Sequence, residues 1–454
     1  MNPELQRLWW LEATTQRLWL LPAALLGSAF VLGRALPFAT ASIALFGFLM
    51  LAMIWGARQA ANAVLDETRE RTWDLQRMSA LPAWSMTWGK LVGATAMPWY
   101  GGAICLALYF AYRPTGALNE SLMWAALVVL IAFIAQTLAF IAALVAVRRE
   151  RQMRPGLHLF IVLILLGLVL PELPAAVRAV ATPDLAVGGS SSQHIMWYGR
   201  RWNGTAFTLS LLGAFAVWSL LGAYRSMCSE LQMRTLPWAW LSFIVFWGAI
   251  GGGFVPGRPA TVAGLAQWCS NTALLACAAS YVAGFAFSRD PIQYRRVFQA
   301  WREGRWRRGA EAMPLWVSSA ALALLLAIVA ALIDVADPAG STRGAMAGAT
   351  ALALVLLMLR DLLLLNWASL RAGAERPEVT TLVYLVLLYH ILPGLLGRAE
   401  LHGARRLLDL PLFDQPWFAA GIAMLHTALA LALAVRAYRT TRARVLSSPG
   451  DRKS

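Results

Sequence analysis

The chain has little charge for its length. Asp, Glu, Lys and Arg make up 14% of its 454 residues and hydrophobic residues make up 59%, whereas soluble domains hold roughly 25% charged and 45–50% apolar residues. So few polar side chains cannot cover a water-soluble globule of this size. The composition therefore predicts that a lipid bilayer surrounds most of the chain.

Cysteine is also scarce. No C-x-x-C pair occurs, which argues against a zinc site and a disulfide framework. The few thiols lie in or beside apolar runs, where buried, inert cysteine is the expected state. These residues are Cys105, Cys228, Cys269 and Cys277.

Catalytic motifs are absent. The sequence contains no H-E-x-x-H and no G-x-S-x-G. His390 and His426 fall inside apolar runs, where they are either functional groups or, as we favour, neutral imidazoles bonded to a neighbouring helix. Arg360 and Asp361 are expected to pair and to snorkel towards a membrane surface. Glu172 is expected at an outer boundary, with a role in a substrate path as the alternative. We therefore predict that the chain is not itself an enzyme.

Long apolar runs are what the chain has in abundance. About 20 residues of helix cross the hydrocarbon core, and only helices satisfy their own backbone polar groups in lipid. We predict an all-α polytopic membrane protein with about twelve transmembrane helices. The predicted spans are 18–33, 38–57, 91–112, 122–147, 157–177, 205–224, 236–255, 262–287, 314–333, 345–365, 379–397 and 417–436.

The distribution of positive charge predicts the orientation. If the spans alternate from a cytoplasmic N-terminus, most of the 39 Lys and Arg residues face the cytoplasm, as the positive-inside rule requires. Both termini are then cytoplasmic. The net charge of +16 is explained by this topology and by anionic lipid headgroups. No nucleic-acid-binding module is present, so we expect membrane lipids and no nucleic acid as partners.

The N-terminus carries a helix-start signal. Asn2, Pro3 and Glu4 suit the N-cap, the first helical position and the first turn. We predict an interfacial helix over 3–17, lying on the cytoplasmic surface, with a frayed tail as the alternative. Three apolar residues share one face of this helix: Leu5, Leu8 and Trp9.

Residues 67–90 (ETRERTWDLQRMSALPAWSMTWGK) form a charged, Trp-rich segment after the second span. Its final Gly-Lys invites a phosphate-loop interpretation, but that motif needs Gly at position 84 and Ser or Thr at position 91. Trp84 and Leu91 stand there instead. ATP, if it is used, must therefore be bound by another subunit.

The same segment has the pattern of a short amphipathic helix. Leu75, Met78 and Leu81 recur at helical spacing, and Pro82 interrupts the helix before the next one begins. An apolar stripe rimmed by charge is typical of a docking surface. A helix lying flat on lipid is the alternative.

The stretch 70–90 resembles the coupling-helix region of ABC-2-type exporter permeases. The family's Gly before the Thr is replaced by Arg71, and its Thr-Pro by Ser79-Ala80, with the proline displaced to Pro82. The resemblance covers about 21 residues in a chain that otherwise shares only the expected architecture. The residues that match are Glu70, Thr72, Trp73, Asp74, Leu75, Gly89 and Lys90.

The resemblance implies a division of labour. A separate ATPase subunit binds ATP and grips the coupling helix, so no cofactor is expected on this chain. Leu75, Met78 and Leu81 would fill the groove of that subunit. The residues implied to set the register at its rim are Glu70, Asp74 and Arg77. The implied location is the bacterial inner membrane, and pairing with a second copy as a homodimer stays open.

Twelve spans suggest two fused six-helix halves, 1–235 and 236–454. Residues 290–314 occupy the position in the second half that 67–90 hold in the first, with Val297, Trp301 and Trp306 among many arginines. A diverged second coupling segment and a plain positive-inside loop are both open. Close helix contacts are expected at small residues, namely Gly248 and 251–253. The outer loop 181–203 is expected to have no fold of its own.

Two other functional classes remain. An ion-coupled secondary transporter should place carboxylates or broken helices at mid-membrane, and the sequence shows few buried acids. A polytopic membrane enzyme or scaffold should show convergent His or Asp/Glu groups at one interface. The cargo, and export rather than import, are not determined by the residues.

Overall fold

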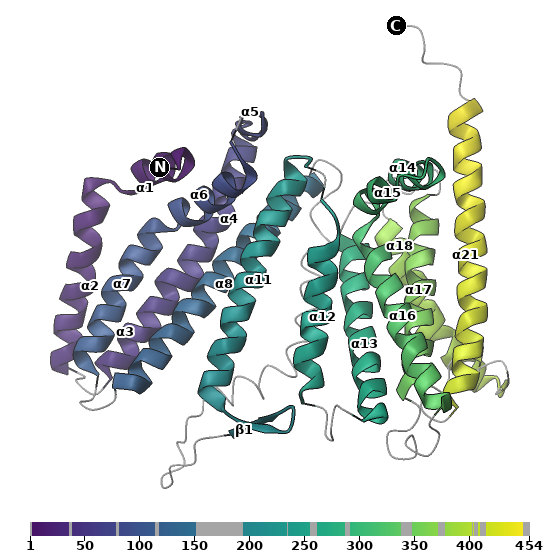
Figure 1. Cartoon of the computed structure of the whole chain (residues 1–454). Coiled ribbons are helices and arrows are strands. Elements are labelled where there is room, and N and C mark those ends of the chain that lie inside the picture. The colour runs from purple at the N-terminus through teal and green to yellow at the C-terminus, as the bar shows by residue number, and fades with distance from the viewer. Residues whose placement is uncertain are drawn as a thin grey trace, which may run out of the picture. The chain divides into compact units, whose positions relative to one another are not determined.

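Over the residues that it describes, the computed structural model is helical, with one β-hairpin (Figure 1). By Cα proximity the chain divides into two compact units. Unit 1 is Met1–Ile195 with Trp202–Thr235, and unit 2 is Met196–Arg201 with Leu236–Ser454. The described residues are 2–35, 39–78, 81–113, 118–150, 194–233, 235–254, 261–286, 291–336, 347–370, 377–401, 403, 407–408 and 415–447.

Unit 1 begins with a short helix at one end of a bundle of long helices, and the short helix α5 lies at that same end (Figure 1). Its helices are α1 (Pro3–Glu12), α2 (Thr15–Ala35), α3 (Thr40–Phe48), the π-helix η1 (Leu49–Trp55), α4 (Gly56–Arg69), α5 (Trp73–Arg77), α6 (Ala83–Ala94), α7 (Ala96–Tyr112), α8 (Leu118–Glu150) and α11 (Gly204–Glu230).

Unit 2 packs its helices around α17, whose residues are the most buried of any long helix described. Its helices are α12 (Trp238–Gly252), α13 (Val262–Ala286), α14 (Pro291–Arg302), α15 (Trp306–Ala312), α16 (Leu315–Ala336), α17 (Ala347–Ser369), α18 (Pro377–Val386), the π-helix η3 (Leu387–Ile391), α19 (Leu392–Arg398) and α21 (Pro416–Ser447).

Each predicted span except 157–177 coincides with a described helix, and 157–177, with Glu172, lies outside the described residues. Within the described part of the chain, nine helices are long and apolar enough to cross a membrane. A tenth arises if α6 and α7, bent by 52°, count as one span. The 15-residue helix α12 is shorter. The chain is thus a multi-pass helical protein by length and composition, while twelve spans in two six-helix halves remain a prediction.

Several helices are interrupted rather than straight. The bend between α6 and α7 lies at Thr95, and the π-helical segments η1 and η3 break two further spans. Such interruptions in a hydrogen-bond ladder often mark functional positions.

The prediction that 181–203 has no fold of its own is wrong for its last ten residues. The strands β1 (His194–Trp197) and β2 (Arg200–Asn203) form a hairpin. Tyr198 and Gly199 both have positive φ, 49° and 71°, as a two-residue hairpin turn requires. Residues 181–193 lie outside the described residues.

Small residues do allow close contacts, as expected, but within unit 2. A Cβ on Gly248 would lie among the atoms of Thr272 on α13, one on Gly252 would meet Trp268, and one on Gly253 would meet Trp197. Gly251 faces open space. The four cysteines are buried and unpaired with one another.

Candidate functional site

The centre of the candidate site is Lys90, on α6. Its side chain is fully buried, although lysine is among the residues least often buried. Its Nζ lies 2.9 Å from Glu4 Oε1 on α1 and 2.5 Å from Glu67 Oε2 on α4, and it donates to Gln76 Oε1 on α5 at 2.7 Å. An ammonium has three N–H donors, so every one has an acceptor. One cation thereby joins four helices.

Arg7 completes the cluster. Its Nη2 lies 2.8 Å from Glu4 Oε1 and 2.5 Å from Glu67 Oε1. We call Glu4, Arg7, Glu67, Gln76 and Lys90 the Lys90 cluster. Its two carboxylates and two cations balance in charge, which is the condition under which buried ions are tolerated.

The pKa values of two side chains on α1 reflect this arrangement. Burial raises the pKa of the Glu4 carboxyl, but the charges and hydrogen bonds of Lys90 and Arg7 outweigh burial, and the pKa lies below its ordinary value. Burial lowers the pKa of Arg7, and its hydrogen bonds to Glu4 and Glu67 more than reverse this. Both groups are therefore held in their charged forms.

Helix α1 reaches the cluster because of its sequence. The Asn2 side chain caps the helix by accepting from the backbone N–H groups of Glu4 and Leu5, and it donates to Ser85 O at 2.7 Å. The predicted start is confirmed, but α1 ends at Glu12, and α2 begins at Thr15.

The buried face of α1 differs from the predicted one. A Cβ on Gly89 would meet Glu4 and Leu5, and a Cβ on Gly93 would meet Leu8. These glycines let α1 lie against α6. Trp9 is exposed, because the Glu4 side of the helix turns inward to reach Lys90.

The turn between α4 and α5 is a Schellman motif. Thr72 N–H donates to Glu67 O at 2.9 Å, and Arg71 N–H donates to Thr68 O at 3.2 Å, the pattern that ends many helices. Arg71 has φ of 59°, a left-handed conformation that glycine adopts most easily. This is the position at which the resembling family carries Gly.

The predicted docking residues divide into three groups by exposure. Glu70, Asp74, Met78 and Pro82 are exposed, and Met78 is 77% exposed. Thr72, Arg77 and Leu81 are half-buried, and Arg77 pairs with Asp74 at 3.5 Å. The buried group is Trp73, Gly89 and Lys90.

The predicted apolar stripe is therefore only partly a surface. Leu81 packs on the core of unit 1, together with Trp73, so neither presents its full face outward. The side chain of Leu75, and residues 79–80, lie outside the described residues. Helix α5 spans only Trp73–Arg77, and Pro82 stands at the N-cap of α6, so the predicted interruption lies where expected.

Sequence reasoning missed the other members of the Lys90 cluster: Glu4, Arg7, Glu67 and Gln76. The available signal was the lysine itself. It stands at the start of an apolar run, and the only other lysine is Lys453. An ionisable residue within a span tends to have a partner of opposite charge, and Glu4 and Glu67 lie in the segments before the first predicted span and after the second.

A second polar cluster lies inside unit 2. Asp361 on α17 receives hydrogen bonds from Arg360 Nε and Nη2 at 2.9 and 2.7 Å. Tyr281 on α13 and Tyr389 in η3 donate to its other oxygen at 2.8 and 3.0 Å. The predicted pairing is present, but Arg360 and Asp361 are both buried, so they do not snorkel.

Over the part of the chain that it describes, the structure does not show the favoured arrangement of His390 and His426, an imidazole bonded to a neighbouring helix. His426 Nδ1 is buried with no hydrogen-bond partner among the described residues, and His390 is exposed in η3. Within the described ranges, neither histidine shows the predicted bond to a neighbouring helix. Across the described residues, no group of three or more His, Cys, Asp or Glu is placed to hold a metal ion.

Comparison with known proteins adds nothing to this description, since no protein-family model, curated protein or solved structure matches the chain. The resemblance of 70–90 to ABC-2 permeases stays a prediction.

Proposed function

We propose that the chain is the membrane permease subunit of an ABC transporter, which moves a substrate across the bacterial inner membrane, by export, while a separate subunit hydrolyses ATP. The observation that carries this proposal is the Lys90 cluster. It ties helix α5, on which Asp74 is exposed, through Gln76 to α4 and to the bent pair α6–α7.

The proposed mechanism is mechanical. The ATPase binds the outward surface of α5, where Glu70, Asp74 and Met78 are exposed. Because Lys90, Glu4 and Glu67 are buried and every N–H of Lys90 has an acceptor, a displacement of α5 is passed to the spans rather than absorbed by a loose loop. ATP binding then favours one of two arrangements of the spans, as differential binding requires.

The turn at Arg71 supports the same family. Its left-handed backbone is the one that the family's glycine would adopt without strain. We assign the buried residues Trp73, Gly89 and Lys90 to holding α5 in place. Only the exposed group is assigned to contact with the partner.

The test is recovery of the ATPase with the full chain purified from its native host. Asp74→Lys and Met78→Asp should each reduce recovery at least tenfold, because they place a wrong charge at the contact. Both side chains are exposed, so the fold should survive. The control variant Glu120→Lys makes the same charge change as Asp74→Lys, but at the start of α8. It should retain the ATPase. Undiminished recovery with both α5 variants would refute the assignment.

A second candidate is an ion-coupled secondary transporter. It is favoured by Asp361, a buried carboxylate near the middle of α17 that contacts the interrupted helix at Tyr389. Carboxylates and broken helices at mid-membrane are typical of that class. Vesicles reconstituted with the chain alone distinguish the two, because only this candidate transports with an ion gradient and no ATPase.

A further inference from the structure

Helices α14 and α15 form a surface at the end of unit 2 where α21 terminates (Figure 1). The helices that precede and follow the pair are candidate spans, Val262–Phe285 and Leu315–Ala336. The pair therefore lies just beyond the membrane-spanning part of unit 2, at the level where lipid headgroups would be.

The pair is held firmly by polar contacts. Tyr294 donates to Asn366 Oδ1 on α17 at 2.7 Å and accepts from Trp316 Nε1 on α16 at 3.2 Å. Gln293 donates to Ala312 O at 3.0 Å, which joins the start of α14 to the end of α15. One face of α14 is consequently turned towards the bundle, where Val297 and Ala300 are buried.

A row of aromatic rings begins at the exposed Phe298 on α14 and continues through the half-buried Trp301 to Trp306 on α15. The rings of Phe298 and Trp301 lie 6.3 Å apart, edge to face, and those of Trp301 and Trp306 also lie 6.3 Å apart. Gly309 makes room for Trp301, since a Cβ there would come within 2.2 Å of its Nε1. Phe298 is 54% exposed and Trp306 is 68% exposed.

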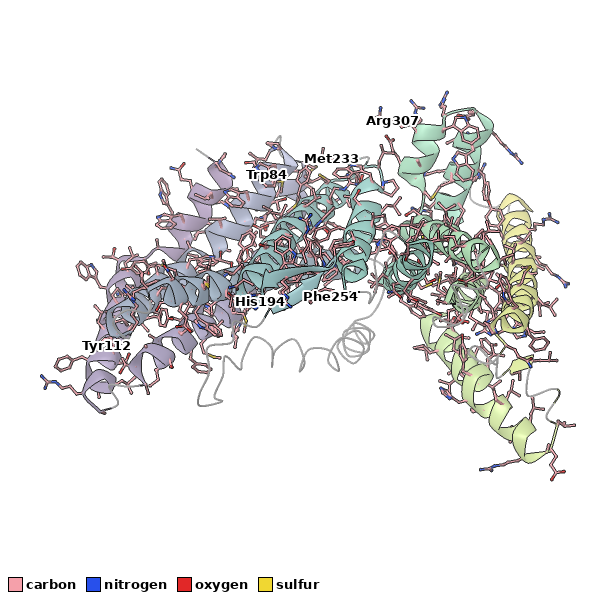
Figure 2. All side chains as sticks on the ribbon, turned by 60° about the horizontal axis from the view of Figure 1, so that its bottom comes forward. Trp84, Tyr112, His194, Met233, Phe254 and Arg307 are labelled. Carbon is pink, nitrogen blue, oxygen red and sulfur yellow. The ribbon has the colours of Figure 1, made fainter. Side chains whose placement is uncertain are left out.

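Arginines surround this row. Arg295 and Arg302 stand three residues before and four after Phe298, on its face of the helix. Arg305 and Arg307 pair with Glu303 and Glu311 at 3.2 and 3.3 Å. Arg307 points away from the helices (Figure 2). Four further arginines pair with no carboxylate among the described residues: Arg295, Arg296, Arg302 and Arg308.

We propose that the surface made by Arg295, Phe298, Arg302 and Trp306 binds the headgroups of anionic phospholipids. Guanidinium forks match phosphate oxygens in geometry, and Trp and Phe beside them suit the interfacial layer at the end of a span. Arginines without a carboxylate partner among the described residues favour an anionic ligand, and the leaflet places anionic headgroups at this level.

The test compares binding of short-chain phosphatidylglycerol and phosphatidylcholine to the full chain in an uncharged detergent. The wild type should prefer phosphatidylglycerol. Arg295→Gln with Arg302→Gln should weaken that preference by roughly tenfold or more, because each basic residue near a headgroup contributes to anionic binding. Trp306→Ala should weaken binding of both lipids.

The matched control is Arg200→Gln with Arg201→Gln, which removes the same charge from exposed residues of β2 and should leave the preference unchanged. An equal loss in this control would overturn the proposal, because net charge alone would then explain binding. An unchanged preference for phosphatidylglycerol in the Arg295→Gln, Arg302→Gln variant would overturn it too. So would a variant that loses a co-purifying protein and not the lipid preference. Unaltered gel-filtration and circular-dichroism profiles exclude unfolding as the cause.

Discussion

Lys90 carries a positive charge to a place that water does not reach. Its burial is tolerated because Glu4 and Glu67 neutralise it and Gln76 takes the remaining donor. The Trp73 ring adds a cation–π contact, with Nζ 5.5 Å from its centroid. Such a cluster need not stabilise the fold against an apolar alternative, but removing one partner leaves uncompensated charge.

We predict that Lys90→Met destabilises unit 1 by about 3–5 kcal/mol, because Glu4 and Glu67 are left with Arg7 alone. Thermal or chemical unfolding in detergent measures the loss. Adding Glu67→Gln to the variant restores the charge balance and should recover much of it. The surface control Arg69→Met breaks only an exposed ion pair with Asp66 and should cost less than about 1 kcal/mol. Equal losses in the single and double variants would contradict the prediction.

Helices α1 and α5 depend on the cluster for their positions. Helix α5 has five residues, far fewer than an isolated helix needs to be stable in water. Helix α1 has a good cap at Asn2, yet its attachment to α6 passes through Glu4, Leu5 and Leu8. The positions of α1 and α5 are therefore fixed by these tertiary contacts and not by the short helices themselves.

The pH dependence of α1 follows from Glu4. The pKa of this carboxyl in the fold lies below its ordinary 4.5. Its contribution to the free energy of unfolding is therefore present above about pH 4.5 and is lost as the pH falls through the lowered pKa. We predict that wild type is more stable than Glu4→Gln at pH 7, and that the gap narrows below pH 4.5. Unfolding midpoints measured across this range test it.

Glu12→Gln serves as the control for that experiment. Glu12 lies in the same helix and pairs only with the exposed Arg17, so its removal should open no comparable gap at any pH. A gap for Glu4→Gln that is constant from pH 7 to pH 4 would show that lost packing, not lost charge, is responsible.

The whole chain is organised by the bilayer. Apolar side chains are exposed along many of the long helices, and Figure 2 shows side chains extending outward all around the ribbon of each unit. In water such a surface would drive aggregation. Lipid removes that penalty, and the positive charge then decides which ends face the cytoplasm.

We predict that Asp74→Cys and Phe298→Cys react with a membrane-impermeant maleimide from the cytoplasmic side, and that Met196→Cys reacts from the outside. All three positions are exposed, and the native cysteines are buried, so background labelling should be low. Intact cells and inside-out vesicles provide the two sides. Labelling of positions 74 and 298 from opposite sides would break the predicted topology.

Much of the fold could be predicted from local pattern. The multi-pass helical class, the cap at Asn2 and the interruption at Pro82 follow from composition and short-range chemistry, which act within a few residues. The end of α5 at Arg77, the bend at Thr95 and the hairpin turn at Tyr198 did not. Each depends on contacts with other helices or on a conformation that no neighbouring residue enforces.

The candidate site shows more sharply the difference between what local sequence predicts and what tertiary contacts decide. The sequence alone predicts that 67–90 is a docking segment, and at its Gly-Lys it lacks the residues that a phosphate loop needs. It says nothing of what Lys90 contacts, because Glu4, Glu67 and Gln76 lie 86, 23 and 14 residues away along the chain. Only the packing of α1 against α6 brings these charges together. A buried ion must be neutralised by whichever partners the fold places beside it, so its role is decided in three dimensions.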